Sequence, residues 1–326
     1  MKVNLALSLS IALGALATFG CGEDASTGSS LGADQIAFSS RTTGNYSIHA
    51  MNASDGSGKT QLTASDTNAY GPAWSPPDGQ DLAFFSDATG QSQIYRMQAD
   101  GGAPAVQVTT DDSNQVSPTW SPDGLRLAYA SDRNHIHIFS DPPILLTFEI
   151  FVIDRDGNNE TQITSDPNPG DTFQPTNTDP DWSTAANRIT FVSNRDITAR
   201  QLGTDIYAMD ADGSNLARLT QTPSITDSDP TWSPDGNRIA FTSNRAGQND
   251  IFVMNADGTG QVNLTDSFSA DQSPSWSPDG TQIAFETYRN AKWEIYVMNA
   301  SDGSGQESRD DGSSTSSVYP AWSPAP

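Results

Sequence analysis

The sequence predicts an all-β fold: a six-bladed β-propeller of four-stranded blades, its ring closed by pairing of a C-terminal strand with N-terminal strands. Three observations predict it. A Trp-Ser pair recurs six times, a tight-turn motif and short apolar runs follow it, and the repeat is cut in complementary places at the two ends of the chain. The propeller is expected to occupy residues 34–326.

The Trp-Ser pair marks the repeat. Successive pairs lie 46, 62, 50, 44 and 46 residues apart. A period in the forties is typical of propeller blades, each of which is one four-stranded unit. The pairs begin at Trp74, Trp120, Trp182, Trp232, Trp276 and Trp322.

The residues after each complete pair predict a chain reversal followed by three strands. In residues 233–236 (Ser-Pro-Asp-Gly), proline presets φ, aspartate bonds its own backbone and glycine completes the turn. Residues 239–243 and 250–254 are strand-like apolar runs. The Asp-Gly at residues 257–258 is a hairpin signal, and it leads to a fourth strand that ends at residues 264–265. Such a unit cannot bury its faces alone, so we expect the repeats to stack around an axis.

The two ends of the chain carry complementary parts of one repeat. Residues 36–38, 46–51 and 59–63 read as strands two to four with no first strand before them. Residues 319–324 (Tyr-Pro-Ala-Trp-Ser-Pro) read as a lone first strand. Pairing between them completes a sixth blade and removes an exposed sheet edge. This closure is the most specific structural prediction that the sequence makes.

The repeat resembles that of a known family. The succession Trp-Ser-Pro-Asp-Gly, Ile-Ala-Phe, Ser-Asn-Arg, Asp-Ile-Phe-x-Met, Asp-Gly and Leu-Thr is similar to the TolB-like, WD40-like (PD40) repeat and extends over residues 34–324. The chain departs from it in the turn at residues 183–187 and in the last fourth strand at residues 306–309. TolB proteins also carry an α/β domain before the propeller. That domain has no counterpart here, so the resemblance does not imply a role in a Tol-type system.

The N-terminus has the layout of a bacterial export signal. Met1-Lys2 precedes an uncharged apolar run, residues 3–19, that ends at Gly20-Cys21. Cys21 is the single cysteine, and the stretch before it resembles a lipoprotein signal, although Thr18 departs from the usual pattern. We therefore expect a signal peptide at residues 1–20 and a lipid on Cys21 that anchors the protein to a membrane. The alternative is simple secretion without an anchor.

The segment after Cys21 predicts a flexible tether. Residues 21–33 are small and polar and cannot form a core. They include Gly28-Ser29-Ser30-Leu31-Gly32, a formal match to the hydrolase nucleophile elbow. That elbow needs a strand before the serine and a helix after it, and neither is predicted here.

The charge balance excludes one class of partner. Lys plus Arg number 16 against 40 Asp plus Glu, for a net charge of −24. Such a chain repels a phosphate backbone, so nucleic acid is excluded as a partner. A single cysteine allows no internal disulfide, and burial and backbone pairing must hold the fold.

The Ser-Asn-Arg motif predicts an ion pair within a blade. Its arginine precedes an acid that opens the third strand, and such a pair closes the loop between strands two and three at about 1 kcal/mol. The alternative is a ligand-binding role for the arginines. The expected pairs are Arg133 with Glu149, Arg195 with Asp205, Arg245 with Asp250, and Arg289 with Glu294.

No cofactor and no metal ion are expected. Residues 154–158 and 210–215 look like short calcium loops, but turn chemistry explains them, since they lack the glutamate at the twelfth position. His135 and His137 lie two apart, and together with a carboxylate they are an alternative divalent-ion site. Alternation along a loop or strand explains them better.

Two adjacent insertions predict a binding face. Residues 134–148 extend a loop between strands two and three, and residues 165–181 form a long acidic, proline-rich connection to the next blade. His135, His137, Leu145 and Phe148 lie in the first of them and are candidate partner contacts. The alternative is an extra hairpin that packs on its own blade.

A ring of residues is expected around the channel mouth on this face. Each lies three positions before a Trp of the repeat, and the ring is suited to a peptide or a cation. The alternative is loop chemistry, since Asp before Pro favours turns. The ring comprises Gly71, Ser117, Asp179, Asp229, Ser273 and Tyr319, of which Asp179, Asp229, Ser273 and Tyr319 are the candidate partner-binding residues.

These features favour a noncatalytic, monomeric binding or scaffold lipoprotein of the bacterial cell envelope, facing the periplasm or the exterior, with a protein partner at the insertion-bearing channel face. The alternative is a polysaccharide-processing or other hydrolytic propeller enzyme. A peptidase of this type needs a further α/β-hydrolase domain. A lyase is expected to have a histidine-rich channel, and this sequence has three histidines.

Overall fold

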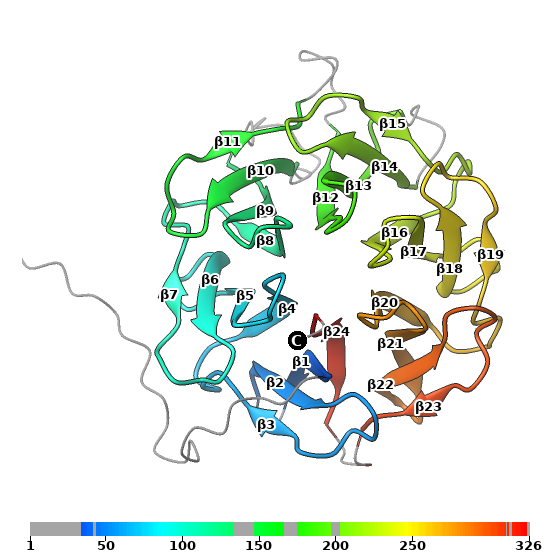
Figure 1. Cartoon of the computed structure of the whole chain (residues 1–326), viewed down its shortest axis with the longest axis horizontal. Helices are drawn as coiled ribbons and strands as arrows, with labels where there is room; N and C mark the ends of the chain where they lie inside the picture. The colour runs from blue at the N-terminus through cyan, green and yellow to red at the C-terminus, as the bar shows by residue number, and fades with distance from the viewer. Residues whose placement is uncertain are drawn as a thin grey trace, which may run out of the picture.

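The computed structural model describes residues 34–41, 44–133, 147–165, 175–196, 203–310, 312 and 315–324. Its strands form six four-stranded antiparallel sheets arranged as blades around a central axis (Figure 1). The predicted all-β, six-bladed propeller is confirmed. Within the described ranges, no helix is long and apolar enough to cross a membrane.

Each blade has an inner first strand at the axis and an outer fourth strand at the rim. Blade 1 comprises β24 (Ser317–Trp322), β1 (Gln35–Arg41), β2 (Tyr46–Asn52) and β3 (Thr60–Gln61). Blade 2 comprises β4 (Ala69–Trp74), β5 (Asp81–Ser86), β6 (Gln93–Gln98) and β7 (Val106–Gln107). Blade 3 comprises β8 (Gln115–Trp120), β9 (Arg126–Ser131), β10 (Glu149–Asp154) and β11 (Thr161–Gln162).

The second half of the ring repeats this order. Blade 4 comprises β12 (Asn177–Trp182), β13 (Arg188–Ser193), β14 (Asp205–Asp210) and β15 (Ala217–Arg218). Blade 5 comprises β16 (Asp227–Trp232), β17 (Arg238–Ser243), β18 (Asp250–Asn255) and β19 (Val262–Asn263). Blade 6 comprises β20 (Asp271–Trp276), β21 (Gln282–Arg289), β22 (Lys292–Asn299) and β23 (Glu307–Ser308).

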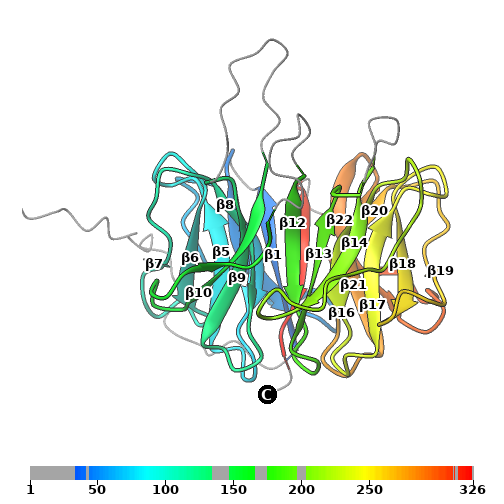
Figure 2. The same cartoon turned by 90° about the horizontal axis from the view of Figure 1, so that it is seen from above.

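The two faces of the ring differ in the loops they carry. The turns that follow each Trp-Ser pair lie on one side, which also holds the end of β24, and we call it the turn face. The connections between blades and the loops between second and third strands lie on the other side, the loop face. Figure 2 shows the ring from its edge, with the turn face at the bottom.

The core lies between neighbouring blades rather than within any one of them. Phe241 and Phe252, on adjacent strands of blade 5, have ring centroids 5.7 Å apart and pack against Val192 and Ile206 of blade 4. Trp232 of the first strand joins the same cluster. The two faces of each second strand therefore pack against the two adjacent blades, as the alternation of apolar and small residues predicts for a strand between sheets.

Blade 1 is closed by the two ends of the chain, as predicted. Ile36 of β1 lies opposite Trp322 of β24, and the Ser323 amide donates to the Gln35 carbonyl at 2.8 Å. The Trp322 indole donates to Asp34 Oδ1 at 2.7 Å. Trp322 is also 8% exposed and packs in the core between blades 6 and 1. Backbone pairing and apolar burial together therefore join the last strand to the first.

The predicted partner of the Ser-Asn-Arg arginine is wrong. Arg245 Nη2 lies 2.9 Å from Asp227 Oδ1, at the start of the first strand, and not beside Asp250 of the third. Its guanidinium lies over the Phe252 ring, 4.7 Å from the centroid, and this contact turns it toward strand one. Arg289 repeats the choice with Asp271 at 3.6 Å.

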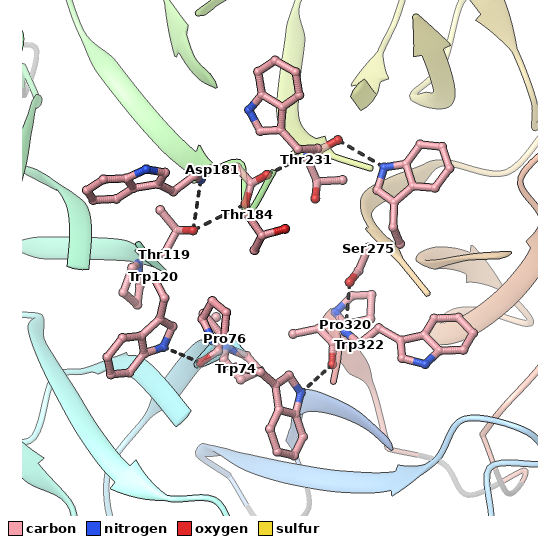
Figure 3. A pocket seen from close by; sticks show the side chains of 18 of the residues that line it. Trp74, Pro76, Thr119, Trp120, Asp181, Thr184, Thr231, Ser275, Pro320 and Trp322 are labelled. Atoms are coloured by element: carbon pink, nitrogen blue, oxygen red, sulfur yellow. Dashed lines mark hydrogen bonds between the residues drawn. The ribbon is translucent and has the colours of Figure 1, made fainter. Parts of the chain in front are cut away.

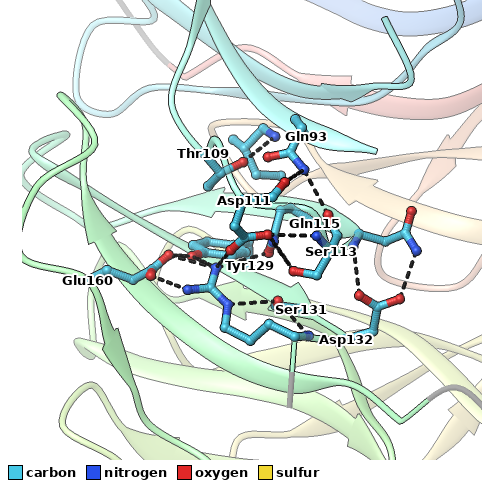
Figure 4. Close-up of polar contacts among 12 residues, drawn as sticks. Gln93, Thr109, Asp111, Ser113, Gln115, Tyr129, Ser131, Asp132 and Glu160 are labelled. Carbon is cyan, nitrogen blue, oxygen red and sulfur yellow. Dashed lines mark hydrogen bonds and ion pairs between the residues drawn. The ribbon is translucent and has the colours of Figure 1, made fainter. Parts of the chain in front are cut away.

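In blade 3 the same arginine has different acids from those expected. Arg133 pairs with Asp111 at 2.9 Å and with Glu160, and its Nη2 donates to the Tyr129 hydroxyl at 3.0 Å (Figure 4). The acid Glu149 instead accepts from Asn177 Nδ2 at 2.9 Å. Arg245 and Arg289 connect strands of their own blade, and Arg133 also reaches the connection between blades 2 and 3, in keeping with a structural role.

Removal of the indole that closes the ring should destabilise the whole propeller. We expect Trp322→Ala to lower the free energy of unfolding by about 3–5 kcal/mol, because a large buried side chain and the hydrogen bond to Asp34 are lost. Chemical denaturation followed by far-UV circular dichroism measures this. Trp322→Phe keeps most of the packing and should lose less. A loss below about 1 kcal/mol in Trp322→Ala would show that closure contributes little.

Candidate functional site

Every first strand is interrupted by a β-bulge three residues before its tryptophan. The register shifts there, for example between Ser228 and Thr231 in blade 5. A proline follows each bulge residue. Because proline has no backbone N–H, the break in the ladder leaves no donor unpaired at that position. The bulge residues have φ of 58° at Gly71, 54° at Ser117, 49° at Asp179, 49° at Asp229, 54° at Ser273 and 54° at Tyr319.

The bulges set one end of a central cavity. Its volume is about 760 Å³, and its lining includes the bulge residues and the prolines of the turn face. The six repeat tryptophans and twelve prolines are among the residues that line it. The walls are therefore largely apolar, whereas the bulge end carries polar and acidic side chains.

The residues just before each tryptophan form an inner ring that connects neighbouring blades. In three of the six positions, the side-chain oxygen of this residue accepts a hydrogen bond from the backbone amide of the next tryptophan around the ring (Figure 3). These bonds are structural, because each joins two blades at the axis. They run from Trp182 to Thr119 at 3.2 Å, from Trp232 to Asp181 at 2.7 Å, and from Trp322 to Ser275 at 2.9 Å.

The indoles add a second set of contacts between blades. Three of the six Nε1 atoms donate backward to a carbonyl of the preceding first strand. Trp182 donates instead to Asn187 in the turn that departs from the repeat, at 3.0 Å, and Trp322 donates to Asp34. The cavity walls are thus fixed before any ligand enters. The backward bonds are Trp74 to Ala321 at 2.9 Å, Trp120 to Ala73 at 3.0 Å and Trp276 to Thr231 at 3.2 Å.

Carboxyl groups of blades 4 and 5 meet at the bulge end. Asp179 accepts from Ser117 Oγ at 3.0 Å, and Asp229 accepts from Ser228 Oγ at 3.1 Å. Burial raises the pKa of both carboxyls, and the negative charge of Asp229 raises that of Asp179 further. Burial also raises the pKa of Asp181, in the inner ring, to about 6.

Glu286 of β21 adds a fourth acid from blade 6, and the sequence analysis missed it. It is 1% exposed and accepts from Gln272 Nε2 at 2.6 Å and from the Tyr319 backbone amide at 2.7 Å. Burial raises its pKa to about 7, and the charge of Asp229 contributes. The signal for it was present, because the corresponding residues of the other second strands are Ser39, Phe85, Ala130, Val192 and Thr242.

Tyr319 brings an aromatic ring to the same place. It is 42% exposed and meets Tyr70 edge-on, with centroids 6.5 Å apart. Burial raises the pKa of its hydroxyl, and the charges of Glu286, Asp229 and Asp179 raise it further. The hydroxyl therefore lies within electrostatic reach of carboxyls from three other blades.

The electrostatics of the cavity are one-sided. Its lining includes Asp179, Asp181 and Asp229 but no lysine or arginine. In the part of the chain that the structure describes, no group of three or more His, Cys, Asp or Glu is placed to hold a metal ion.

The structure brings the predicted ring together and describes one of the four insertion residues. The six ring residues all line the central cavity. Phe148 is half-buried against the core between blades 3 and 4. Cys21, His135, His137 and Leu145 lie outside the described residues, as do segments 1–20 and 21–33.

The repeat geometry agrees with a comparison against family models. A model described as "TolB beta propeller domain" matches residues 24–142 and 146–325. The chain belongs to the TolB β-propeller family. A comparison with curated proteins finds no match.

Solved structures share the fold of this TolB-family propeller. TolB from Acinetobacter baumannii is 22% identical with a TM-score of 0.69, and the match covers 89% of this chain and 67% of that one. A putative TolB from Agrobacterium tumefaciens is 23% identical with a TM-score of 0.64, over 86% of this chain and 90% of that one. An oligogalacturonate lyase from Vibrio parahaemolyticus is 16% identical with a TM-score of 0.50, over 87% and 74%. At these identities the likeness shows the fold alone.

The raised pKa of Glu286 predicts a pH-dependent stability. Its folded-state pKa of about 7 exceeds the ordinary value of 4.5, so the folded state holds the proton more tightly and stability falls as pH rises between these values. We expect Glu286→Gln to remove this decline. From pH 5 to pH 8, the free energy of unfolding of the variant should gain roughly 2–3 kcal/mol relative to wild type.

Denaturation at both pH values measures this difference. Asp257→Asn is the control, because hydrogen bonds from Thr259 lower the pKa of this exposed turn carboxyl, and its small effect should have the opposite sign. Equal slopes for wild type and Glu286→Gln would show that Glu286 ionises normally in the folded protein.

Proposed function

We propose that this protein is a noncatalytic binding or scaffold lipoprotein of the bacterial cell envelope, and that the central channel receives a segment of a protein partner. The observation that carries the proposal is the cavity of about 760 Å³, with apolar walls and acidic groups at its inner end. Such a recess, lined by apolar side chains with a few convergent polar groups, is the usual form of a binding site. Membership of the TolB propeller family supports an envelope role.

The environment of His49 supports a binding role over a catalytic one. His49 lies on β2 between blades, is 4% exposed, and stacks on Phe38 with centroids 5.8 Å apart. Burial lowers its pKa to about 4, and the charge of Lys59 contributes. It is therefore neutral at physiological pH and remote from the channel. A polysaccharide-processing or hydrolytic enzyme stays the alternative, and oligogalacturonate lyase among the similar folds is its support.

The proposed anchor constrains how the channel faces the membrane. Asp34 and Gln35 lie beside Trp322 and Ser323 on the turn face, so a tether from Cys21 would join the propeller there. A flexible chain of 13 residues spans about 20 Å on average. The cavity opening would then face the membrane across a gap wide enough for an extended segment of another envelope protein. The insertion-bearing loop face, the binding face expected from the sequence, would face away.

Site-specific photo-crosslinking in intact envelopes tests the proposal. A photoreactive residue at Ser275, inside the cavity, should capture one defined protein. The same residue at Thr259, on an exposed outer hairpin, is the matched control and should not. Loss of the Ser275 adduct while Thr259 captures the same protein would contradict binding in the channel.

Deletion of residues 134–148 separates the two faces. If the channel is the site, we expect the Ser275 adduct to persist in this variant. Loss of all capture on deletion would assign the partner to the loop face instead. Capture at neither position, combined with turnover of an acidic polysaccharide by the purified protein, would favour the enzyme.

A further inference from the structure

We propose that the channel binds a cationic side chain, a lysine or arginine carried on an extended segment of the partner. This rests on the proposed function and names the chemistry of that partner. Four observations carry it: carboxyl groups without a basic partner, the contrast with other buried acids of this protein, an exposed aromatic ring beside the carboxyls, and a long apolar approach to them.

The carboxyls that line the cavity have only uncharged hydrogen-bond donors, and so does the buried Glu286, which contacts the lining residues Ser273 and Tyr319. Asp179 is bonded to Ser117 and Thr178, and Asp229 to Ser228. Glu286 is bonded to Gln272, Ser273 and the Tyr319 amide. Each donor satisfies a lone pair but leaves the negative charge uncompensated, and a buried charge without a counter-ion is costly.

Elsewhere several buried acids of this protein pair with arginine. Near the loop face, Asp227 is fully buried and lies 2.9 Å from Arg245, and Asp205 lies 2.6 Å from Arg218. On the turn side, Asp81 has Arg96 at 3.5 Å and also pairs with Arg155. The channel acids lack such a partner, because the lining of the cavity contains no lysine or arginine. A cation from outside the chain would give the channel acids the kind of partner that Asp81, Asp205 and Asp227 have within the chain.

Tyr319 supplies a second kind of attraction for a cation. It is the one large aromatic residue in the bulge ring, and its ring is open to the cavity at 42% exposure. The charges of Glu286, Asp229 and Asp179 all act on its hydroxyl, so ring and carboxyls surround the same space. An aromatic face beside carboxylates is a favourable environment for an ammonium or guanidinium group.

The shape of the cavity favours a cation with an apolar stem. Between the turn face and the bulges, the walls are formed by tryptophans and by prolines such as Pro234, Pro278 and Pro320. Lysine and arginine bury their methylene groups along such surfaces while their charged ends reach polar groups. The volume of about 760 Å³ exceeds that of one side chain, so backbone of the partner enters as well.

The spacing of the carboxyls favours an organic cation over a bare metal ion. A calcium ion takes six to eight oxygen ligands at 2.3–2.6 Å. The described residues include no cluster of acids placed to supply such a set. An ammonium or guanidinium group has several donors on a larger body and matches carboxyls spread over three blades.

The test uses two capped pentapeptides, Gly-Pro-Lys-Pro-Gly and its norleucine analogue, with the full chain in 0.15 M salt and EDTA. Norleucine keeps the stem and removes the charge. Titration followed by tryptophan fluorescence and by calorimetry should show at least tenfold tighter binding of the lysine peptide. The double variant Asp179→Asn/Asp229→Asn replaces two of the facing carboxylates with neutral amides. It should bind the lysine peptide at least tenfold more weakly than wild type.

A matched variant controls for net charge. Asp257→Asn/Asp302→Asn removes the same charge from exposed outer turns and should bind the lysine peptide as wild type does. Equal binding of both peptides, or equal losses in the two double variants, would overturn the inference. If the channel variant fails to fold, the wild-type protein alone provides the test. A cation beside the carboxyls lowers their pKa, so binding of the lysine peptide near pH 6 should release protons. This release is measured as a dependence of the binding heat on the ionisation enthalpy of the buffer.

The outcomes separate this inference from the proposed function. Capture at Ser275 with no preference for lysine over norleucine would leave a channel-binding protein and reject the cation. A lysine preference that vanishes without EDTA, in millimolar calcium, would assign the carboxyls to a metal ion and also reject it. Absence of capture at Ser275 would reject the proposed function whatever the peptides do.

Discussion

The fold depends on one constraint: a four-stranded blade cannot bury either face without a neighbour. Phe241 and Phe252 of blade 5 complete their packing only against blade 4, and each blade is in the same position. An open array would therefore leave two apolar faces in water. The antiparallel pairing of β24 with β1 buries both of these faces at once. Strand pairing, apolar packing and the hydrogen bond of the Trp322 indole all occur at this closure.

The candidate site is a by-product of how these blades meet at the axis. The bulge before each tryptophan lets the chain include proline there and turns one side chain per blade toward the channel. The inner ring is used for hydrogen bonds between blades, which leaves the bulge ring free to vary. Its variation is uneven: the two acids come from blades 4 and 5 and the tyrosine from blade 1, while Glu286 of blade 6 approaches from the second strand. Polar and acidic side chains are thus placed at the axis without a change in the scaffold.

Local sequence predicted most of the fold, because turns, strand runs and the period are properties of a single repeat. The closure was also predictable, since its evidence is a missing strand at one end and a surplus strand at the other. The partner of Arg245 was not, because the stacking on Phe252 that directs it to Asp227 depends on side-chain packing. Glu286 was missed for a related reason. Its contact with the Tyr319 amide crosses from one blade to the next, and no pattern within a repeat reports it.

The closure of blade 1 also has a consequence for folding. The strand that completes the first blade follows all the other strands of the propeller in sequence, so the contact of Ile36 with Trp322 joins its two ends. Contacts between distant residues must overcome the entropy of closing a long loop, and they slow folding. Until residues 317–322 are synthesised, the blades form an open stack in which one edge of β1 is unpaired, and such an edge requires protection from aggregation. Synthesis of β24 is therefore the event that permits the ring to form.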